Sequence, residues 1–487
     1  MRKLKELVEL DEILASSVDL EIPVLEIIQD SRLAKSGSLF VAIRGHQSDG
    51  HQFIPEVLSK GAIALVDKAY PKISAGMIQV DSTREMMGKI GSRFWGRPTS
   101  QFQLVGVTGT NGKTTTTFLL DQIWNSMGLV TGLLGTVKNK IAGDVIEAQL
   151  TTPGALELQA LFHRMAQRRV EVCAMEVSSI ALDQFRTMGS RFQVGVFTNF
   201  TQDHLDYHQT MERYLEAKLK FFKDYELPCV VVNIDDEYSD RVLRVSSGAR
   251  QLTFSLTQTS ASFHVLECQF KKNGTSARIQ TPRGEFEIKS PLIGAHNLQN
   301  ILSVLAVVEG LGQDLTQAIK ALETAPGAPG RLERAMVGDY YPHIFIDYAH
   351  SDDALENVLK ALHKLRGDSP GKIITVFGCG GDRDRGKRPK MARVASLYSD
   401  VTIATSDNPR TEDPEKIINE IEVGIAKEKT QYFREVNRRE AIYLALKKAR
   451  PEDIVLIAGK GHENYQVIGT HKHDFDDKLV VRDYYSS

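Results

Sequence analysis

A glycine-rich stretch in the first quarter of the chain has the residue types that hold a polyphosphate. The segment VGVTGTNGKTTTT (105–117) runs from an apolar strand through Gly109 and Gly112 to Lys113 and Thr114, which open a predicted helix. Backbone N–H groups at such a helix start bind phosphate oxygens, a lysine contacts the β and γ phosphates, and a threonine hydroxyl binds Mg²⁺. Only two residues separate the glycines, which departs from the strict Walker form, and a plain glycine-rich turn is the alternative. We predict a nucleotide-binding loop formed by Gly109, Thr110, Asn111, Gly112, Lys113, Thr114 and Thr115.

Two further predicted strands end in groups suited to a metal ion. The first, VEVCAMEVSS (170–179), places Glu176 where its apolar run stops. The second, VFTNFTQDHLDYH (196–208), ends in Asp203, His204, Asp206 and His208. Hard cations such as Mg²⁺ prefer carboxylate oxygens, so Glu176 is the natural ligand and a histidine a less typical one. A capped helix start with surface histidines is the alternative for the second group.

A lysine occupies an unusual place on the helix that the sequence predicts next. In TMERYLEAKLKFFKDY (210–225), Lys218 lies on the same face as the apolar residues Met211, Tyr214, Leu215, Leu219 and Phe222. The lysine either extends its charged end to water or is partly buried, with its pKa lowered so that neutral amine is available. A neutral amine can capture CO₂ as a carbamate, which would supply oxygen ligands for a second Mg²⁺.

Polar loops follow four predicted strands in the last third of the chain. The strands are 343–347, 372–377, 401–405 and 453–458, and the loops after them are YAHSDD, GCGGDRDRGKRP, SDNPRTEDP and GKGHENYQ. Ligands of open parallel sheets bind outside the carboxyl ends of the strands, so we expect these loops to converge. Arg410 would then face a site and hold a carboxylate or phosphate as a bidentate pair. A surface ion pair with Glu412 or Asp413 is the alternative.

These residues need a scaffold of parallel strands covered by helices. Strand-like runs at 103–107, 170–175, 194–199 and 229–233 alternate with helical patterns, which indicates an α/β fold with mostly parallel sheets. Glycine and proline mark two seams, at 93–103 and 323–333. We predict a small α/β N-terminal domain, a central P-loop parallel-sheet domain and a C-terminal Rossmann-like domain, with boundaries 1–98, 99–330 and 331–487.

Composition excludes several classes of protein. The 487 residues include 60 basic and 62 acidic ones, and this formal charge of −2 gives no electrostatic footprint for nucleic acid. The four cysteines form no CxxC pair, which argues against a zinc site or a disulfide framework. The N-terminus lacks the apolar core of a signal peptide, and no run approaches the roughly 18 apolar residues of a membrane span. We therefore expect a soluble, cytoplasmic protein.

Ordered motifs along almost the whole chain resemble the Mur ligase family, and within it the ligases that add diaminopimelate. The motifs are GTNGKTTT, TTPG, MEVSS, DHLDYH, EAK, GAHNLQN, GRLE, DYAH, GCGGDRDRGKRPKM, DNPR and GKGHE, and the likeness extends into residues 30–53. The resemblance implies an ATP-dependent ligase that joins meso-2,6-diaminopimelate to UDP-N-acetylmuramoyl-L-alanyl-D-glutamate through an acyl phosphate. It further implies cytoplasmic peptidoglycan precursor synthesis, two Mg²⁺ ions, a carbamylated Lys218 and a monomer.

The resemblance also assigns residues to substrates. Catalytic and metal-binding roles fall to Lys113, Thr114, Glu176, His204 and Lys218. ATP would be contacted at the domain junctions by His296, Asn297, Asn300, Arg331 and Asp347. The uridine-linked substrate would be bound by Ser31, His46, Gln47, Ser48, Thr151, Thr152, Ser178, Gln184 and Arg186. Diaminopimelate would be bound by Arg383, Asp407, Asn408, Pro409, Arg410, Gly459 and Glu463.

Four residues depart from the family pattern, and three other functions compete with this one. Ile180 stands where histidine is common, Gln202 where arginine is common, and Ser351-Asp352 where Thr-Pro is usual. Folylpolyglutamate synthase has a similar P-loop and similar acidic motifs but lacks the N-terminal segment. A P-loop ATPase that drives movement or signalling would hydrolyse ATP without an amino acid. A homologue that only binds is disfavoured by the intact Lys113, Glu176 and His204.

Overall fold

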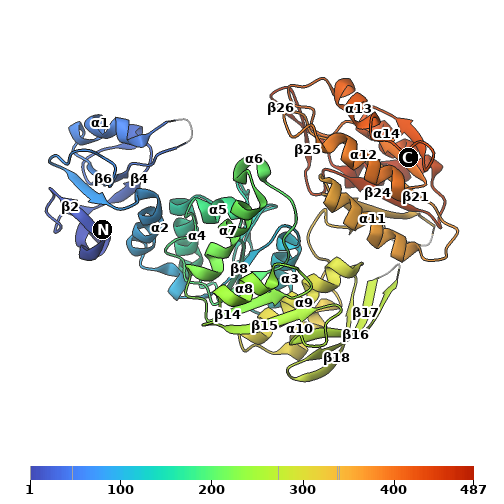
Figure 1. Ribbon diagram of the computed structural model, residues 1–487, viewed down its shortest axis with the longest axis horizontal. Helices are drawn as coiled ribbons and strands as arrows, with labels where there is room; N and C mark the ends of the chain where they lie inside the picture. Colours follow the sequence, from blue (N-terminus) through green and yellow to red (C-terminus); the bar gives the residue numbers. More distant parts are fainter. Residues whose placement is uncertain (1, 46–47, 272–273, 337, 339, 487) are drawn as a thin grey trace.

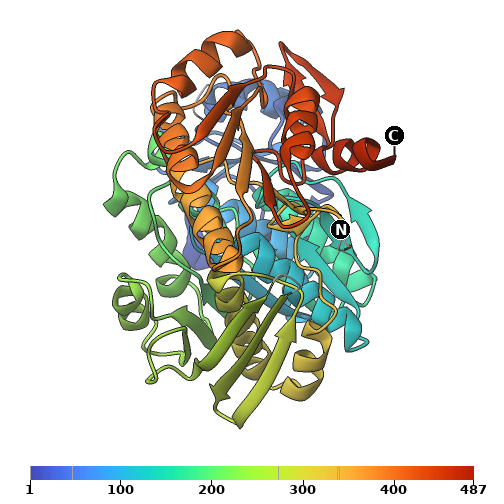
Figure 2. The ribbon, with the colours of Figure 1, turned by 90° about the vertical axis from the view of Figure 1, so that its right-hand side faces the viewer.

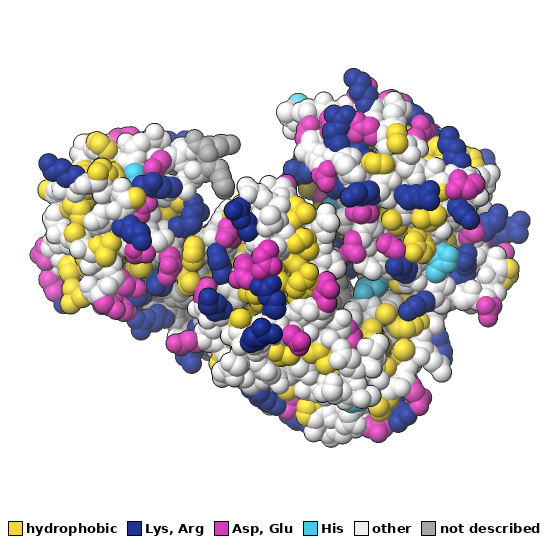
Figure 3. Space-filling view, viewed as in Figure 1, with side chains coloured by type: hydrophobic (Ala, Val, Ile, Leu, Met, Phe, Trp, Pro, Cys, Tyr) yellow, Lys and Arg dark blue, Asp and Glu magenta, His cyan; other side chains and the backbone are white. Residues whose placement is uncertain are grey.

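The computed structural model describes residues 2–45, 48–271, 274–336, 338 and 340–486, and it consists of three α/β domains in chain order. Figure 1 shows the N-terminal domain in blue and the C-terminal domain in orange and red on either side of the central domain. The space-filling view is hollowed between the two outer domains, above the central one (Figure 3). No helix within the described ranges has both the length and the apolar character needed to cross a membrane.

The N-terminal domain is a five-stranded sheet with the order β2-β7-β6-β5-β4, in which only β2 runs antiparallel to its neighbour. Its strands are β2 (Ile13–Ser16), β4 (Glu26–Ile28), β5 (Ser38–Val41), β6 (Ile63–Asp67) and β7 (Met77–Val80), beside a small pair of β1 (Arg2–Lys3) and β3 (Pro23–Val24). Its helices are α1 (Ile54–Ser59) and α2 (Thr83–Phe94). The Ser82 hydroxyl caps α2 by accepting the Glu85 N–H, and α2 then leads into the central domain.

The central domain is built on an eleven-stranded sheet with the order β11-β10-β9-β12-β8-β13-β14-β15-β16-β17-β18. Its parallel part comprises β8 (Gln103–Thr108), β9 (Thr131–Leu134), β12 (Val172–Glu176), β13 (Val194–Phe197), β14 (Cys229–Asn233), β15 (Arg250–Ser255) and β16 (Phe263–Lys271). Antiparallel strands extend both edges: β10 (Asn139–Ile141), β11 (Asp144–Ile146), β17 (Gly274–Thr281) and β18 (Gly284–Ser290).

Helices cover both faces of this sheet, which explains why its central strands are apolar along their whole length. One face packs on α3 (Lys113–Ser126), α9 (Ala295–Gly310) and α10 (Leu315–Leu322). The other packs on α4 (Ala155–Gln167), α5 (Ser179–Asp183), α7 (Met211–Lys223) and α8 (Ser239–Val245), and the short α6 (Leu205–His208) lies before α7.

The C-terminal domain is a six-stranded sheet with the order β19-β20-β24-β21-β22-β23, parallel except for β19. The strands are β19 (Glu333–Arg334), β20 (His343–Asp347), β21 (Ile373–Phe377), β22 (Val401–Ala404), β23 (Gln431–Arg434) and β24 (Ile454–Ala458). One face packs on α11 (Asp352–Arg366), α12 (Lys387–Tyr398) and α13 (Pro414–Glu422), and the other on α14 (Arg438–Lys448) and α15 (Asp477–Ser486). A hairpin of β25 (Tyr465–Ile468) and β26 (His471–Asp474) follows β24.

The α/β class and the eight strands predicted in the last two domains are confirmed. In particular β20, β24, β21 and β22 are parallel neighbours, so the four polar loops after them leave the same edge of one sheet.

The departure at Ser351-Asp352 has a local explanation, because the Ser351 hydroxyl caps α11 by accepting the Ala354 N–H. Asp352 then places a negative charge in the first turn of that helix, where it is favourable.

A buried ion pair joins the last two helices of the C-terminal domain and gives a prediction of stability. Arg438 and Asp477 have no exposed side-chain surface, and Nε and Nη2 of Arg438 donate to the two carboxylate oxygens at 2.8 and 2.7 Å. Asp477→Asn would leave the guanidinium buried without a counter-charge. We therefore expect the free energy of unfolding of this domain, measured in urea, to fall by about 3–5 kcal/mol. The exposed Glu428→Gln should change it by less than about 0.5 kcal/mol. An equally small effect of Asp477→Asn would contradict this role.

Candidate active site

The glycine-rich loop lies between β8 and α3 and is shaped by contacts with the loop after β13. Gly109 and Gly112 have φ angles of 148° and 87°, and a Cβ at Gly109 would lie 1.9 Å from the Thr198 hydroxyl. The Asn111 N–H donates to the Asn199 side chain at 2.8 Å. Glycine is therefore required at both positions, and the first-turn N–H groups of α3 are left to bind an anion.

Lys113 is folded over this loop. Its Nζ donates to the carbonyl oxygens of Gly109 and Thr110, both at 2.8 Å. Burial lowers the pKa of this ammonium, and the nearby Glu176 carboxylate partly offsets the effect. Lys113 therefore lies against the anion-binding loop, and a rotation of its flexible side chain would bring the ammonium group to a phosphate bound there.

Glu176 stands at the end of β12, beside the loop. Its carboxylate accepts the Thr114 hydroxyl at 3.0 Å, and it accepts the Thr136 N–H at 2.9 Å and the Thr136 hydroxyl at 3.1 Å. A Cβ at Gly135 would lie 2.4 Å from the same carboxylate. The predicted pair of Thr114 and Glu176 is therefore brought together, with Thr136 as a third member that the sequence analysis missed.

Lys218 is buried beneath the glycine-rich loop. Only 1% of the residue is exposed, its Nζ donates to the Gly109 carbonyl oxygen at 2.8 Å, and it lies 4.7 Å from the centre of the Tyr214 ring. Burial lowers the pKa of this ammonium well below its ordinary value, and Lys113 lowers it further. The helical face predicted for Lys218 is confirmed, and of the two alternatives the buried one holds.

Tyr214 connects Lys218 to the histidine motif. Its hydroxyl is 3.1 Å from the Thr110 hydroxyl, and its ring centroid is 6.0 Å from that of His204 and 5.1 Å from that of His208. His204 adopts a left-handed backbone conformation with φ of 52°, which is uncommon and strained outside glycine. The two histidines differ, because the His208 Nε2 pairs with the Ser179 hydroxyl at 2.9 Å, whereas the His204 side chain is 42% exposed.

The residues predicted for the peptide part of the uridine-linked substrate form one cluster next to Glu176. The Thr152 hydroxyl donates to the Glu176 backbone oxygen at 2.8 Å, and an Arg186 Nη donates to the Thr152 backbone oxygen at 3.1 Å. Arg186 also donates to the Gln184 side chain at 2.6 and 3.0 Å. Thr151 is 3.1 Å from the Thr136 hydroxyl, and Ser178 is 3.3 Å from that of Thr152.

The nucleotide residues predicted at the domain junctions fall into two groups. Asn300 lies against the glycine-rich loop, since a Cβ at Gly112 would be 2.6 Å from its Oδ1, and it donates to Asn297 at 3.3 Å. Burial lowers the pKa of the neighbouring His296 to about 4. In the C-terminal domain Arg331 stacks 4.7 Å from the Tyr348 ring centre, and Asp347 accepts the N–H groups of Leu332 and Ala349.

One carboxylate of the C-terminal domain reaches the glycine-rich loop. Asp353, in the first turn of α11, accepts the Asn111 side-chain amide at 3.3 Å and the Thr201 hydroxyl at 3.2 Å. Figure 2 shows the orange C-terminal helices standing directly above the central domain. Asp353 thus connects the two domains, a role that no sequence pattern pointed to.

The DNPR segment and its neighbours form a polar cluster in the C-terminal domain. Arg410 has a φ of 51°, its N–H donates to the Val467 carbonyl at 3.0 Å, and its Nη1 donates to the Gly381 carbonyl at 2.8 Å. A Cβ at Gly380 would lie 2.9 Å from Arg410 Nη1 and 3.7 Å from Arg383 Cγ. These are the two arginines predicted to bind diaminopimelate.

Asn408 and Glu463 join two of the predicted loops. The Asn408 amide donates to the Glu463 carboxylate at 2.8 Å. Asp407, Pro409 and Gly459 lie buried beside them. Among the residues that the structure describes, Arg410 makes no ion pair. Glu412 is instead held by the buried Arg388 at 2.7 and 3.0 Å, and Asp413 caps α13 by accepting the Glu415 N–H. The alternative of a surface pair of Arg410 with Glu412 or Asp413 is therefore wrong.

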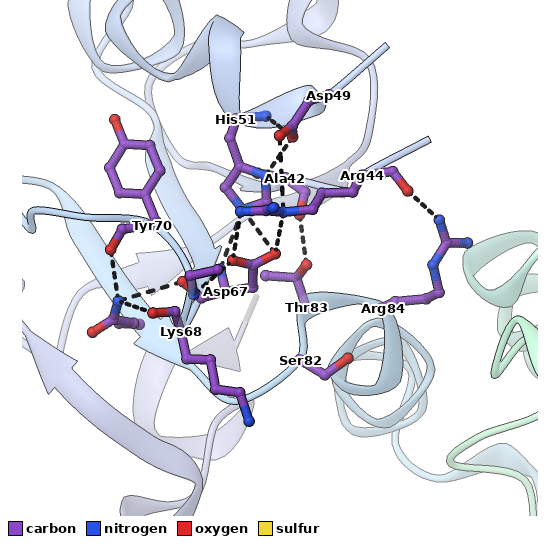
Figure 4. Close-up of polar contacts among 12 residues, drawn as sticks. Ala42, Arg44, Asp49, His51, Asp67, Lys68, Tyr70, Ser82, Thr83 and Arg84 are labelled. Atoms are coloured by element: carbon purple, nitrogen blue, oxygen red, sulfur yellow. Dashed lines mark hydrogen bonds and ion pairs between the residues drawn. The ribbon is translucent and has the colours of Figure 1, made fainter. Parts of the chain in front are cut away.

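The N-terminal candidates lie apart from these clusters. Ser31 is buried and Ser48 exposed, and His46 and Gln47 fall outside the described residues. Arg44 and Asp49, near Ser48 in the sequence, belong to the polar cluster in Figure 4, where an Arg84 Nη donates to the Arg44 carbonyl at 2.5 Å. His51 Nε2 accepts the Asp67 N–H at 3.2 Å, so Nδ1 carries the proton and donates to Asp49 at 2.6 Å.

The central cluster fits Mg²⁺ that arrives with a nucleotide. Within the described ranges no three His, Cys, Asp or Glu side chains gather in a way that could hold a metal ion alone. Mg²⁺ instead keeps water and binds through one or two carboxylates plus substrate phosphates. Glu176 and the Thr114 hydroxyl at a helix start match that requirement.

Comparisons with known proteins cover nearly the whole chain. Residues 107–308 match the Mur ligase middle domain, 330–461 the Mur ligase glutamate ligase domain, and 26–95 the Mur ligase family catalytic domain. A protein of Trichormus variabilis named UDP-N-acetylmuramoyl-L-alanyl-D-glutamate--2,6-diaminopimelate ligase is 42% identical over 461 residues, 93% of this chain and 92% of that protein. Its namesake from Listeria monocytogenes serotype 4b is 40% identical over 487 residues, covering 99% of this chain and 98% of that protein.

A solved structure agrees with these sequence matches. The structure of a protein with the same name superposes with a TM-score of 0.74 at 32% identity, covering 100% of this chain and 99% of that one. The likeness therefore extends through all three domains rather than through the P-loop region alone. The chain belongs to the Mur ligase family.

Proposed function

We propose that this protein is an ATP-dependent ligase that adds meso-2,6-diaminopimelate to UDP-N-acetylmuramoyl-L-alanyl-D-glutamate in peptidoglycan precursor synthesis. The observation that carries the proposal is the polar cluster at Arg410, where a strained arginine without an ion pair among the described residues flanks buried Asp407 and Asn408. Such a cluster suits an amino acid with a carboxylate and an ammonium group at its far end. The relatives that align over 93–99% of this chain carry the name of that activity.

The reaction follows from the arrangement around the glycine-rich loop. A γ-carboxylate oxygen of the D-glutamate attacks the γ-phosphorus of ATP, the bond to the bridging oxygen breaks, and ADP leaves. The amine of diaminopimelate then attacks the acyl carbon of the resulting acyl phosphate, and inorganic phosphate leaves. Lys113 turns from its carbonyl partners to the phosphates and offsets their charge. Arg186 and Thr152 orient the peptide beside Glu176.

Magnesium and the buried lysine complete the proposal. Mg²⁺ held by Thr114 and Glu176 would neutralise phosphate charge, and a second ion near His204 and Lys218 would do the same. Lys218 takes up CO₂ through its neutral amine, which burial favours by lowering the pKa of the ammonium: the nitrogen bonds to the carbon, releases one proton and becomes a carbamate. This converts a buried amine into an anionic oxygen ligand beneath the loop.

The three domains would divide the substrates between them. We place their boundaries near residues 98 and 330, where α2 leads into β8 and where the chain passes from α10 to β19. The N-terminal domain would hold the uridine nucleotide through Ser31 and the 46–48 segment, and the C-terminal domain the amino acid. Asp353 supports an arrangement in which the C-terminal domain closes over the ATP loop. We assign the protein to the cytoplasm as a monomer.

Arg410 provides a test of the substrate assignment. Arg410→Met should lower kcat/KM for meso-diaminopimelate at least about a hundredfold, or roughly 2.8 kcal/mol, because a charge-assisted bidentate pair is lost. The much slower turnover of L-lysine, which lacks the far carboxylate, should change less than about threefold. The exposed Arg393→Met on α12 serves as the control. An equal loss for both amino acids would show that Arg410 does not read the far carboxylate.

The proposed reaction is tested by its product. Incubation of the protein with the uridine-linked dipeptide, Mg·ATP and meso-diaminopimelate should give a nucleotide heavier by one diaminopimelate residue, with one ADP per product, as measured by mass spectrometry. A folylpolyglutamate synthase would instead extend a folate with glutamate. Formation of that product, and none with the uridine-linked substrate, would overturn the proposal.

A further inference from the structure

Lys460 is a fully buried lysine in the polar cluster proposed to bind the amino acid. It follows β24 between Gly459 and Gly461, and none of its side chain is exposed. Lysine is almost never fully buried unless its charge is compensated, because removing an ammonium group from water is costly. The sequence analysis did not select this residue, and the proposed reaction does not use it.

The ammonium group of Lys460 faces polar groups from two loops. Its Nζ donates to Asn408 Oδ1 and to Glu463 Oε2, each at 3.3 Å, and lies 3.7 Å from Asp407 Oδ1. Asn408 Oδ1 also accepts the Val467 N–H at 2.9 Å, which connects the cluster to β25. One buried cation therefore joins the DNPR loop, the GKGHE loop and the hairpin that holds Arg410.

The cluster is incomplete in charge and in hydrogen bonds. Two carboxylates, Asp407 and Glu463, face the single ammonium of Lys460, and no other cation among the described residues makes an ion pair with either of them. Asp407 is 6% exposed, yet its Oδ1 has no hydrogen-bond partner among the described residues. The nearby buried Arg438 does not supply the missing charge, because it is paired with Asp477. A ligand cation would complete the cluster.

We propose that Lys460 is a positioning residue that sets the preference for an amino-acid substrate with a second ammonium group. This inference rests on the proposed function. Lys460 holds Asp407 and Glu463 within reach of one another despite their like charge, and it fixes the Asn408 side chain between them. Without the lysine the carboxylates repel, the two loops lose their common partner, and the far end of the substrate is held poorly.

Lys460→Met removes the charge and nearly preserves the volume, so it tests positioning directly. The KM for meso-diaminopimelate should rise at least about thirtyfold, while kcat and the KM for Mg·ATP stay within about threefold. The reason is that the far end of the amino acid is bound equally well in the ground state and in the transition state, so its loss changes KM rather than kcat. General damage to the domain would raise the KM for ATP as well, since Asp347 ends β20 of the same domain and Arg331 lies just before β19. Lys416→Met, an exposed lysine on α13, is the matched control.

A second variant covers the case in which Lys460→Met does not fold. Lys460→Arg keeps the cation but displaces its nitrogens, and it should raise the KM for diaminopimelate at least about fivefold with kcat within about threefold. An unchanged KM in a folded variant, or a parallel rise in the KM of all three substrates, would overturn the inference alone. Absence of diaminopimelate-dependent ligation in the wild-type protein would overturn the proposed function together with it.

Discussion

Lys113→Ala should lower kcat for ligation by roughly three orders of magnitude, which corresponds to about 4 kcal/mol of transition-state stabilisation. The Lys113 ammonium lies at the mouth of the glycine-rich loop, 2.8 Å from the Gly109 and Thr110 carbonyl oxygens. Phosphoryl transfer depends on positioning and on charges directed at the phosphoryl oxygens, so its removal acts mainly on the chemical step. Single-turnover formation of ADP measures this step directly.

The fold should tolerate the loss of Lys113. Burial already lowers the pKa of this ammonium, so its removal sacrifices little favourable interaction, and we expect less than about 1 kcal/mol of change in unfolding free energy. Lys320→Ala, an exposed lysine on α10 of the same domain, should leave turnover unchanged. Wild-type ligation by a folded Lys113→Ala protein would show that the glycine-rich loop has been misassigned.

Lys218→Met should lower kcat by a similar factor of about a thousand while keeping the packing of α7. Methionine fills the space of this 1% exposed side chain but cannot bind CO₂. In the wild-type protein, buffer freed of CO₂ should cause a reversible loss of activity that bicarbonate restores. Intact-mass measurement under native conditions should show the added mass of one CO₂ on the wild type and none on the variant.

A neighbouring lysine separates carbamylation of Lys218 from general effects of charge. Lys223 is exposed on the same helix, and Lys223→Met should retain activity, CO₂ dependence and the added mass. Should Lys218→Met retain full activity, or should bicarbonate have no effect on the CO₂-depleted wild type, the carbamate would have no part in the reaction. The P-loop assignment would stand in either case, because it depends on Lys113 and Glu176.

The sequence was sufficient for the parts of this site that follow local rules. Apolar runs ending in polar loops identified β20, β21, β22 and β24, and a topological rule predicted that their loops would converge. The helical period placed Lys218 on a buried face, and glycines beside Lys113 indicated an anion-binding helix start. Each inference needed only neighbouring residues and a general property of sheets or helices.

Other features depend on contacts between distant segments. Lys460 lies between two glycines and reads as a solvent-exposed loop residue, and only the fold shows it buried against Asn408 and Glu463. In the sequence Asp353 is an ordinary carboxylate at a helix start. Only the fold shows that it accepts the side-chain amide of Asn111 from another domain. The bridge between Arg410 and Ile468 likewise joins two segments far apart in the sequence. No periodicity or spacing predicts such pairings.

The most direct test of the central claim is the release of ADP from Mg·ATP and UDP-N-acetylmuramoyl-L-alanyl-D-glutamate in three parallel reactions. One receives meso-diaminopimelate, one L-lysine and one no amino acid. Rapid release only with diaminopimelate is the predicted result, because the acyl phosphate turns over when the correct amine arrives. Turnover with lysine alone would contradict the account of Arg410, and equal release in all three reactions would identify an ATPase rather than a ligase.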